Sequence, residues 1–381
     1  MNKNRTTFEK ARSAIVDRVL STLNTIDGRF PFVADPDAGE WETTTDGNWC
    51  PGHWIGLLWL AWREATSDQD RKRAGLAART YTQKAAWDQL RGSLFAGMNY
   101  RYAGFRAANI SGDEQLDSIG YRGSKHVQSS FDETAAVVPV GDFGTRGLER
   151  HAKKADSTVA AVDAVYTAIS LLWRAAAKSG DNRYSRVARR HTQTHLDWFC
   201  REDGSVWHKA SFDPEAGTLQ RQYNQLTRNA DACWSRGLGW SVAGLVDAYN
   251  HTEKRAYLEA IERHIEYYRT NTPADEVPYA EMGPDVTSQY RDTSAAALVT
   301  YGLVRLHGSG SNVRRLREYG QRVLESLVDE YLVLEGPLRG QLRSGCYNAV
   351  DDTATEHELV WSTHYLLCAL VAMDGDAAPL E

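Results

Sequence analysis

The chain has 381 residues, of which 42% are hydrophobic and 25% charged, with a formal net charge of -6. This balance permits a sizeable core and argues against a general nucleic-acid binder, which would carry excess positive charge. No apolar run approaches the length that crosses a bilayer. We therefore expect neither a nucleic-acid nor a membrane partner, and an anionic substrate would have to be met by local cations.

The cysteines and the N-terminal residues bear on the cellular compartment. Five cysteines, an odd number with no Cys-x-x-Cys pair, favour reduced thiols. Residues 1–20 are typical of an amphipathic helix rather than a signal peptide. We expect a cytoplasmic protein, and the sequence leaves its oligomeric state open.

In chain order, one pattern recurs: the apolar end of a helix, a short polar turn, and the start of another helix. Apolar spacing around the turns is helical, as in Ile15, Val19 and Leu23. Strand-like alternation is limited to residues 205–213 and 277–283. Residues 111–156 are the least regular, and we expect them to cover the mouth of a pocket. The six copies of the pattern begin at Leu57, Tyr102, Leu171, Gly244, Tyr301 and Tyr365.

Six helical hairpins, none able to bury its own apolar stripe, can close into a ring. The predicted fold is therefore all-α, an (α/α)6 barrel with six inner and six outer helices. An open superhelical stack is the alternative. No Pro- or Ser-rich linker interrupts the chain, so residues 1–381 are predicted to form a single domain.

The chain lacks a P-loop, a dinucleotide-binding glycine motif, a GxSxG elbow and an HExxH pair, and its histidines lack zinc spacing. No metal site is predicted. The chain has 12 Trp and 18 Tyr against 9 Phe, a composition that sugar-binding clefts use but an aromatic core explains equally well. Trp49, in a loop before a helix, is a candidate for pocket exposure.

Asp163 lies near the start of an otherwise apolar helix. A carboxylate there must be paired, capped or functional, because burying it unpaired is costly. If burial raises its pKa, Asp163 can act as a general acid and base near neutral pH. The alternative is an Asp favoured by the dipole at a helix start.

Two further segments could contribute to a pocket. His208 lies in a loop or short strand, where histidine is more often structural than catalytic. Trp234, Arg236 and Trp240 flank two glycines at the start of a helix. Arg236 could pair with a substrate carboxylate, or could be satisfied by backbone carbonyls at the turn.

Several segments, taken in order, resemble the unsaturated glucuronyl hydrolases of glycoside hydrolase family 88 and the related unsaturated rhamnogalacturonyl hydrolases. They are GRFPFVAD from Gly28, NWCPGHWIGLLWL from Asn48, the helix with Asp163, WHKASFDPEAG from Trp207, CWSRGLGW from Cys233 and YRDTSAAALVTYGL from Tyr290.

The resemblance implies an (α/α)6 barrel and an unusual hydrolysis. An Asp protonates the C4=C5 double bond of an unsaturated uronic acid, water adds at C5, and the glycosidic linkage then collapses. Asp163 matches the acid and base. The resemblance implies no metal and no organic cofactor, and a small or oligosaccharide substrate that carries a carboxylate. The positions that match the substrate pocket are Trp49, His208, Trp234, Arg236 and Trp240.

The chain departs from the family pattern at the pocket. A second pocket Asp of the family falls on Phe95 here, within LFAGMNYRY from Leu94. Asn99 or Tyr100 could take over part of its role. A family His falls on Gln225, and the last motif is WSTHYLL from Trp361. Losing the carboxylate makes the site drier and would change the substrate or the reaction.

Three functions follow from these observations. The first is hydrolysis of an unsaturated uronyl glycoside. The second uses the same acid and base for elimination, hydration or isomerisation of a modified sugar or sugar-containing metabolite, and Phe95 motivates it. The third is a carbohydrate-binding toroid without catalysis.

Overall fold

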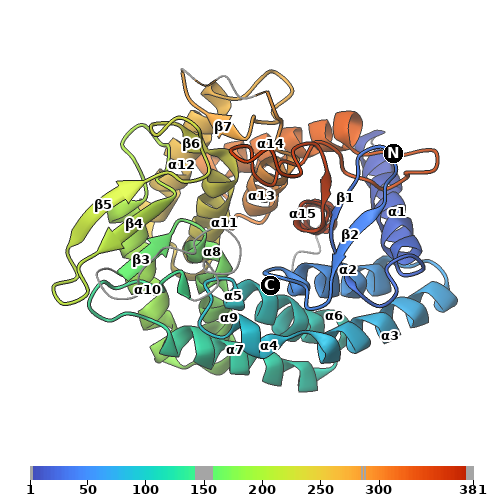
Figure 1. Cartoon of the computed structure of the whole chain (residues 1–381), viewed down its shortest axis with the longest axis horizontal. Coiled ribbons are helices and arrows are strands. Elements are labelled where there is room, and N and C mark those ends of the chain that lie inside the picture. Colours follow the sequence, from blue (N-terminus) through green and yellow to red (C-terminus); the bar gives the residue numbers. More distant parts are fainter. Residues whose placement is uncertain (1–2, 142–157, 285, 287–288, 375–381) are drawn as a thin grey trace.

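The computed structural model describes residues 3–141, 158–284, 286 and 289–374. In this part of the chain the helices form an inner and an outer ring (Figure 1). The inner segments are α2 (Pro51–Glu64), α5 (Ala96–Arg101) with η1 (Tyr102–Arg106) and α6 (Ala107–Ser111), α8 (Ala164–Thr167) with α9 (Ile169–Ser179), α11 (Ser235–Thr252), α13 (Thr293–Val304) and α15 (Val360–Met373). The outer helices are α1 (Lys3–Thr22), α3 (Asp68–Lys84), α7 (Asp117–Ser129), α10 (Asn182–Trp198), α12 (Arg255–Thr270) and α14 (Ser311–Ser326).

Burial separates the two rings. Residues 293–303 of α13 are all buried, as are residues 360–372 of α15. In α14 only one face is buried, at positions such as Val313, Leu316 and Val323. A helix that is apolar all round requires neighbours on every side, whereas one apolar stripe suits an outer layer. The predicted (α/α)6 barrel is therefore the observed fold.

Each of the six repeated turns follows an inner helical segment. After α9, Gly180 adopts the left-handed conformation with φ of 70°, and it does so without steric strain because glycine has no Cβ. The Asp181 side chain then accepts a hydrogen bond from the backbone of Arg183 and caps α10. Ser67 does the same for α3. Short polar turns thus end the inner segments, and after the first five of them an outer helix follows.

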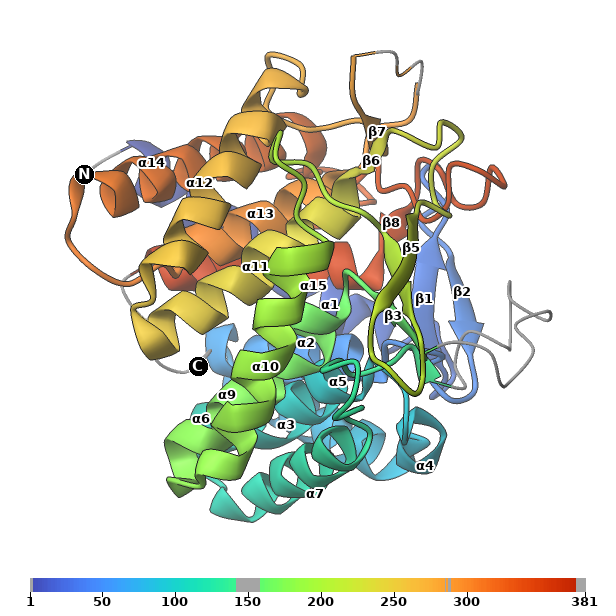
Figure 2. The ribbon, with the colours of Figure 1, turned by 90° about the vertical axis from the view of Figure 1, so that its left-hand side faces the viewer.

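The strands gather at one end of the rings (Figure 2). All pairings are antiparallel: β1 (Phe30–Ala34) with β2 (Trp41–Thr44) and β8 (Glu358–Leu359), β4 (Lys209–Phe212) with β3 (Thr158–Ala161) and β5 (Leu219–Tyr223), and β6 (Cys233–Trp234) with β7 (Glu281–Met282). The predicted strand segments 205–213 and 277–283 contain β4 and β7. Because β3, β6 and β8 lead directly into α8, α11 and α15, the starts of the inner helices share this end.

The ring closes between the first and last parts of the chain. Helix α1 contacts both α2 and α15. Strand β1 pairs with β8, where Ala34 lies opposite Glu358. The Glu358 carboxylate, fully buried, accepts a hydrogen bond of 2.9 Å from Nη2 of Arg18. This seam joins residues 340 positions apart.

A polar layer fills the centre of the ring. The Tyr102 hydroxyl lies 2.9 Å from that of Tyr166 and 2.7 Å from that of Tyr365. Deeper along the inner helices, Asp247 accepts hydrogen bonds from Arg101 at 2.6 Å and Arg305 at 2.8 Å. Burial opposes ionisation of Asp247, but the two guanidinium groups lower its pKa. These groups are buried, so they stiffen the centre of the ring.

The prediction for residues 111–156 was partly wrong. Residues 117–129 form the regular outer helix α7, because Gly120 and Gly123 let it lie directly on α5 and η1. Residues 142–156 lie outside the described part of the chain. None of the described helices combines the length and apolar character needed to cross a membrane.

Candidate active site

Asp163 lies at the junction where β3 ends and α8 begins. Its side chain accepts no capping hydrogen bond from the helix, and only 5% of the residue is exposed. No Lys or Arg of the described residues lies within 4 Å of its carboxyl group. Burial therefore dominates and raises the pKa of Asp163 to about 6, against smaller opposing effects of its own backbone N–H and the charges of Arg236 and Lys209. A carboxyl group titrating near pH 6 can both give and take a proton.

His208 is the side chain that faces this carboxyl group. Its Nε2 lies 4.0 Å from Oδ2 of Asp163. Burial, aided by the charges of Lys209 and Arg236, holds the pKa of His208 well below its usual value, so the ring is neutral. Its Nδ1 is buried without a hydrogen-bond partner among the described residues. A buried polar atom without a partner is costly, and a ligand hydroxyl is one group that could satisfy it.

Trp234 and Arg236 continue the group from the start of α11. The Trp234 ring lies 4.9 Å from the His208 ring, and the guanidinium carbon of Arg236 lies 4.7 Å from the Trp234 centroid. Nη1 of Arg236 donates to Asp292 at 2.7 Å and to the carbonyl of Cys346 at 2.5 Å. Arg236 therefore holds backbone carbonyls, which is one of the two alternatives raised by the sequence, and it also pairs with a carboxylate of the protein itself. Its pairing with a substrate carboxylate stays a prediction.

The opposite part of the group is aromatic. We call Phe32, Trp49, Phe95, Tyr347 and Trp361 the aromatic arc. Trp361 lies 5.4 Å from Phe32, 4.7 Å from Trp49 and 5.5 Å from Tyr347, and Trp49 lies 4.9 Å from Phe95.

Both ends of the aromatic arc join the polar residues. At one end, the carbonyl of Tyr347 accepts a hydrogen bond of 2.6 Å from Arg236. At the other end, the carbonyl of Leu94, which precedes Phe95, accepts a hydrogen bond of 2.9 Å from the hydroxyl of Thr167. Thr167 lies in α8, one turn after Asp163. The contacts therefore form a closed circuit at the strand-bearing end of the barrel, with an acid on one side and aromatic rings on the other.

Residues 124–353 match glycosyl hydrolase family 88. The chain belongs to this family. The resemblance inferred from the sequence is thereby confirmed, and the protein is a hydrolase by family.

Two curated family members illustrate how far the similarity extends. The unsaturated glucuronyl hydrolase of Bacillus sp. (strain GL1) is 23% identical over 352 residues, 91% of each chain. That of Formosa agariphila is 30% identical over 207 residues, 53% of this chain and 52% of its own. The crystal structure of the Bacillus enzyme superposes with a TM-score of 0.85 at 21% identity, covering 97% of this chain and 98% of that one. This structural likeness agrees with the barrel described above.

Three of the predicted pocket residues of this family 88 protein have side chains that contact other parts of the protein, and their roles in substrate binding stay predictions. Asn99 is fully buried, and its side chain is used by the backbone of Gly52 at 2.6 Å and the carbonyls of Trp49 and Phe95 at 2.8 Å each. These bonds position Trp49 and Phe95. Tyr100 faces α7, where its hydroxyl lies 3.3 Å from Nδ1 of His126, and the hydroxyl also lies 3.3 Å from the carbonyl of Trp87.

Trp240 is the third. It is 1% exposed and stacks on Tyr166 at 5.6 Å, inside the ring below Asp163. Its assignment to the substrate pocket stays a prediction. Gln225 lies in the loop between β5 and β6, half-buried, with no hydrogen bond seen to the described residues of the circuit.

Sequence reasoning missed Asp292, Phe32 and Tyr347. Asp292 caps α13 by accepting from the backbone of Ser294 and also orients Arg236. Its position before the apolar helix TSAAALVTYGL was a signal for a cap, although not for its Arg partner. Trp361 begins the segment WSTHYLL, which the sequence comparison had singled out. Its contact with Trp49 could not be predicted, because it forms only when the last inner helix closes the ring against the first.

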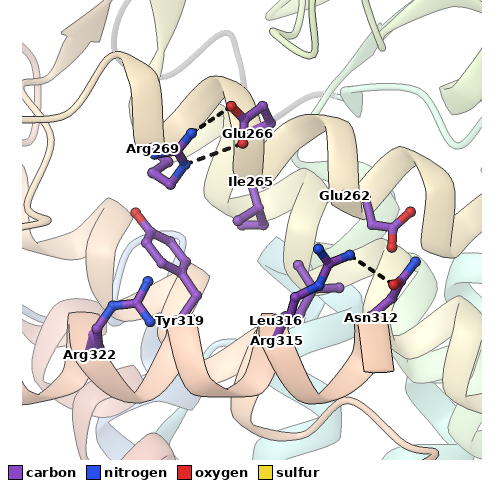
Figure 3. Close-up of a pocket in the computed structure, with 9 residues that line it drawn as sticks. All are labelled: Glu262, Ile265, Glu266, Arg269, Asn312, Arg315, Leu316, Tyr319 and Arg322. Carbon is purple, nitrogen blue, oxygen red and sulfur yellow. Dashed lines mark hydrogen bonds and ion pairs between the residues drawn. The ribbon is translucent and has the colours of Figure 1, made fainter. Parts of the chain in front are cut away.

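A separate hollow of about 400 Å3 lies between the outer helices α12 and α14 (Figure 3). Its floor is Ile265, Leu316 and Tyr319, and Arg269 pairs with Glu266 at its edge. None of its lining residues belongs to the circuit around Asp163. Among the described residues, no group of three His, Cys, Asp or Glu side chains is placed to hold a metal ion.

Proposed function

We propose that this protein hydrolyses glycosides of a 4,5-unsaturated uronic acid, with Asp163 as both acid and base. The observation that carries the proposal is the buried Asp163 carboxyl group, whose pKa is raised to about 6 beside the neutral His208. The family members named above support it, because two of them are unsaturated glucuronyl hydrolases. The unsaturated chondroitin disaccharide hydrolase of Streptococcus pneumoniae is 23% identical over 334 residues, 86% of this chain and 82% of its own.

The proposed reaction needs only a proton and one water molecule. The protonated Asp163 gives its proton to C4 of the C4=C5 bond. The resulting carboxylate takes a proton from a water molecule whose oxygen bonds to C5, so the carboxyl group is restored. The hemiketal at C5 opens to a ketone, which leaves a hemiacetal at C1. Loss of the alcohol from that hemiacetal cleaves the glycosidic linkage, with net consumption of one water.

The other residues of the circuit have proposed roles in binding. His208 can satisfy a sugar hydroxyl with its unpartnered Nδ1. Trp234 offers a ring face for the CH groups of a pyranose. Arg236 contributes positive charge toward the substrate carboxylate while it holds the loop at Tyr347. Trp49, Phe95 and Gln225 stay proposed binding residues.

The proposal requires no metal or organic cofactor, since a carboxyl group and water supply every atom that moves. We also propose that the enzyme works in the cytoplasm on a soluble saccharide. The five cysteines, which form no disulfide with one another, support a reducing compartment.

The test is loss of the ultraviolet absorbance of the conjugated double bond when the protein is mixed with lyase-generated unsaturated oligosaccharides. Asp163→Asn should lower kcat by two to four orders of magnitude, about the contribution of a positioned acid and base. Asp113→Asn, at a surface ion pair with Arg79, serves as the matched control and should retain activity. If the wild-type protein consumes no unsaturated uronide, the proposal fails.

Phe95 motivates the second candidate, in which the same acid drives elimination, hydration or isomerisation. The aromatic ring stands where the family motif has a carboxylate. Mass spectrometry of the products separates the two candidates. Hydrolysis splits the substrate into two molecules that together gain one water, whereas isomerisation conserves the mass and hydration adds one water without cleavage. If the protein binds the substrate but forms no product, the third candidate, a carbohydrate-binding toroid without catalysis, is supported instead.

A further inference from the structure

We infer that Asn224 is a positioning residue, whose amide holds His208 and Trp234 in place in the active site. The inference rests on the proposed function, because that function gives His208 and Trp234 their roles in binding. It starts from the end of the sheet in which β3, β4 and β5 lie side by side (Figure 1). His208 directly precedes β4, and Asn224 directly follows β5.

The antiparallel ladder brings Asn224 opposite His208. Lys209 pairs with Tyr223 at the end of the β4–β5 ladder, so His208 and Asn224 are the next two residues to meet. There a side chain makes the hydrogen bond: the N–H of His208 donates to Oδ1 of Asn224 at 2.9 Å. The carbonyl of His208 accepts a second bond of 2.9 Å from the N–H of Val162, which directly precedes the acid. The backbone of His208 is therefore held from both sides.

The amide nitrogen of Asn224 reaches the segment that leads into β6. Nδ2 donates to the carbonyl of Ala230 at 2.8 Å and to that of Ala232 at 2.7 Å. Trp234 follows in β6, and its ring lies 4.9 Å from the ring of His208. An asparagine side chain has one carbonyl oxygen and two N–H donors, and here all three are used. One amide thus joins the backbone at His208 to the backbone that carries Trp234.

The contacts between the rings and the acid do not by themselves fix these positions. Nε2 of His208 lies 4.0 Å from Oδ2 of Asp163, which is longer than a hydrogen bond. The rings of His208 and Trp234 meet at 51°, in an aromatic contact that is less directional than a hydrogen bond. The backbones therefore set where the rings lie, and Asn224 joins two of these backbones. A displacement of about 1 Å at such a site can lower a rate about a hundredfold.

A second side chain holds the middle of the loop between Asn224 and Trp234. Glu281, which is 4% exposed, lies opposite Trp234 in the β6–β7 ladder. Its Oε2 accepts a hydrogen bond of 2.9 Å from the N–H of Arg228. Because this bond does not involve Asn224, the loop keeps one anchor when the amide is removed. Substitution of Asn224 should therefore displace His208 and Trp234 locally and leave the barrel folded.

Asn250 provides a matched control near the C-terminal end of α11. Its Oδ1 accepts a hydrogen bond of 2.9 Å from the N–H of His307, and its Nδ2 donates to the carbonyl of Arg305 at 2.9 Å. Like Asn224 it is half-buried and joins two segments of the chain, but its partners follow the end of α13. Asn224→Ala and Asn250→Ala should each lower Tm by about 1–3 °C, so the two variants differ in place and not in the kind of bond lost.

Kinetics on a lyase-generated unsaturated disaccharide separate the two variants. Asn224→Ala should lower kcat/KM about 10- to 100-fold, whereas Asn250→Ala should stay within about twofold of wild type. Asn224→Asp keeps the shape of the side chain but turns an oxygen toward the carbonyls of Ala230 and Ala232. It should therefore lower kcat/KM at least as much as Asn224→Ala. Equal losses in the Asn224 and Asn250 variants overturn the inference.

A double-mutant cycle tests whether Asn224 acts through His208. In a protein that already carries His208→Ala, the ring to be positioned is absent. Asn224→Ala should then lower kcat/KM by only about threefold, because two residues that act together have effects that do not add. A purely structural role would give the same loss in both backgrounds, and that result overturns the inference.

Hydrogen exchange followed by mass spectrometry keeps the inference testable apart from activity. Asn224→Ala should speed exchange in peptides that cover residues 207–210 and 230–235, and Asn250→Ala should leave both unchanged. If the wild-type protein cleaves no unsaturated uronide but this pattern is found, the proposed function fails and the positioning by Asn224 stands. If the substrate is cleaved and the two variants behave alike, the inference alone is wrong. Unchanged exchange around His208 overturns it whether or not the protein is active.

Discussion

Asp163→Asn should make the protein more stable while abolishing its activity. The folded protein raises the pKa of this carboxyl group from 3.8 to about 6. A shift of about two units corresponds to about 3 kcal/mol between the two protonation states. Because the folded-state pKa lies above the unfolded value, the associated stability is fully present below pH 3.8 and is lost as pH rises through about 6. At pH 8 the buried charge therefore destabilises the wild-type protein by about 3 kcal/mol.

Asparagine has nearly the same shape and no charge, so it removes this cost. With an unfolding entropy of about 2.1 cal/mol/K per residue, the gain corresponds to an increase in Tm of about 4 °C at pH 8. The gain should fall to about half at pH 5 and nearly vanish at pH 4, where the wild-type carboxyl group is protonated in the folded state.

Differential scanning calorimetry of both proteins from pH 4 to pH 8 measures this dependence. Asp292→Asn is the matched control, because Asp292 is buried but paired with Arg236 at 2.7 Å. Removing that partner leaves an uncompensated buried charge and should destabilise by about 3–5 kcal/mol. A difference in Tm for Asp163→Asn that is independent of pH, or a loss of stability at pH 8, would refute the assignment of Asp163 as a buried unpaired acid.

Three further results are expected. Since the protonated form of Asp163 gives the proton, kcat/KM should fall about tenfold per unit above about pH 6, and a pH–rate profile that stays flat to pH 8 would contradict this. Tyr100→Phe should lower the free energy of unfolding by about 1 kcal/mol and leave kcat/KM within about twofold, because its hydroxyl bonds to the carbonyl of Trp87 behind α5; a tenfold loss of activity would place it at the substrate. Burial lowers the pKa of His264 to about 4, so the contribution of its neutral ring to the free energy of unfolding is complete above pH 6.5 and is lost as pH falls toward 4. His264→Gln should therefore reduce the acid-induced loss of stability, followed by urea unfolding, by about 3 kcal/mol. An unchanged acid-induced loss would show that other groups control acid unfolding.

The barrel was predictable because its signal is local and repeated. Each turn, such as the one at Gly180 and Asp181, stops one helix and caps the next within a few residues. Six such turns with apolar helices between them leave few arrangements that bury every stripe. Asp163 was also predictable, since a carboxyl group among apolar residues is conspicuous in the sequence.

The direction of side chains around each inner helix was not predictable. Phe95 and Asn99 are four residues apart and share a face, whereas Tyr100 is one residue further and lies about 100° around the helix axis. Periodicity shows which residues share a face, but both sides of an inner helix are buried, so burial cannot tell the ring axis from the outer layer. Only the packing of Gly123 against the Tyr100 ring resolves it.

Long-range partners were missed for a related reason. Arg236 pairs with Asp292, which is 56 residues away in the sequence, and with the carbonyl of Tyr347, which is 111 residues away. Nothing in the spacing of these residues indicates that their loops meet. The ring brings them together because the starts of all the inner segments share one end.

The seam between Arg18 and Glu358 also sets an order of events during synthesis. The first hairpin leaves the ribosome long before β8 and α15, which complete its surroundings, have been translated. Until then the face of α2 that contacts α15 in the finished barrel lacks that neighbour. A chain that ended before residue 358 would lack both the Glu358 carboxylate and the strand that pairs with β1.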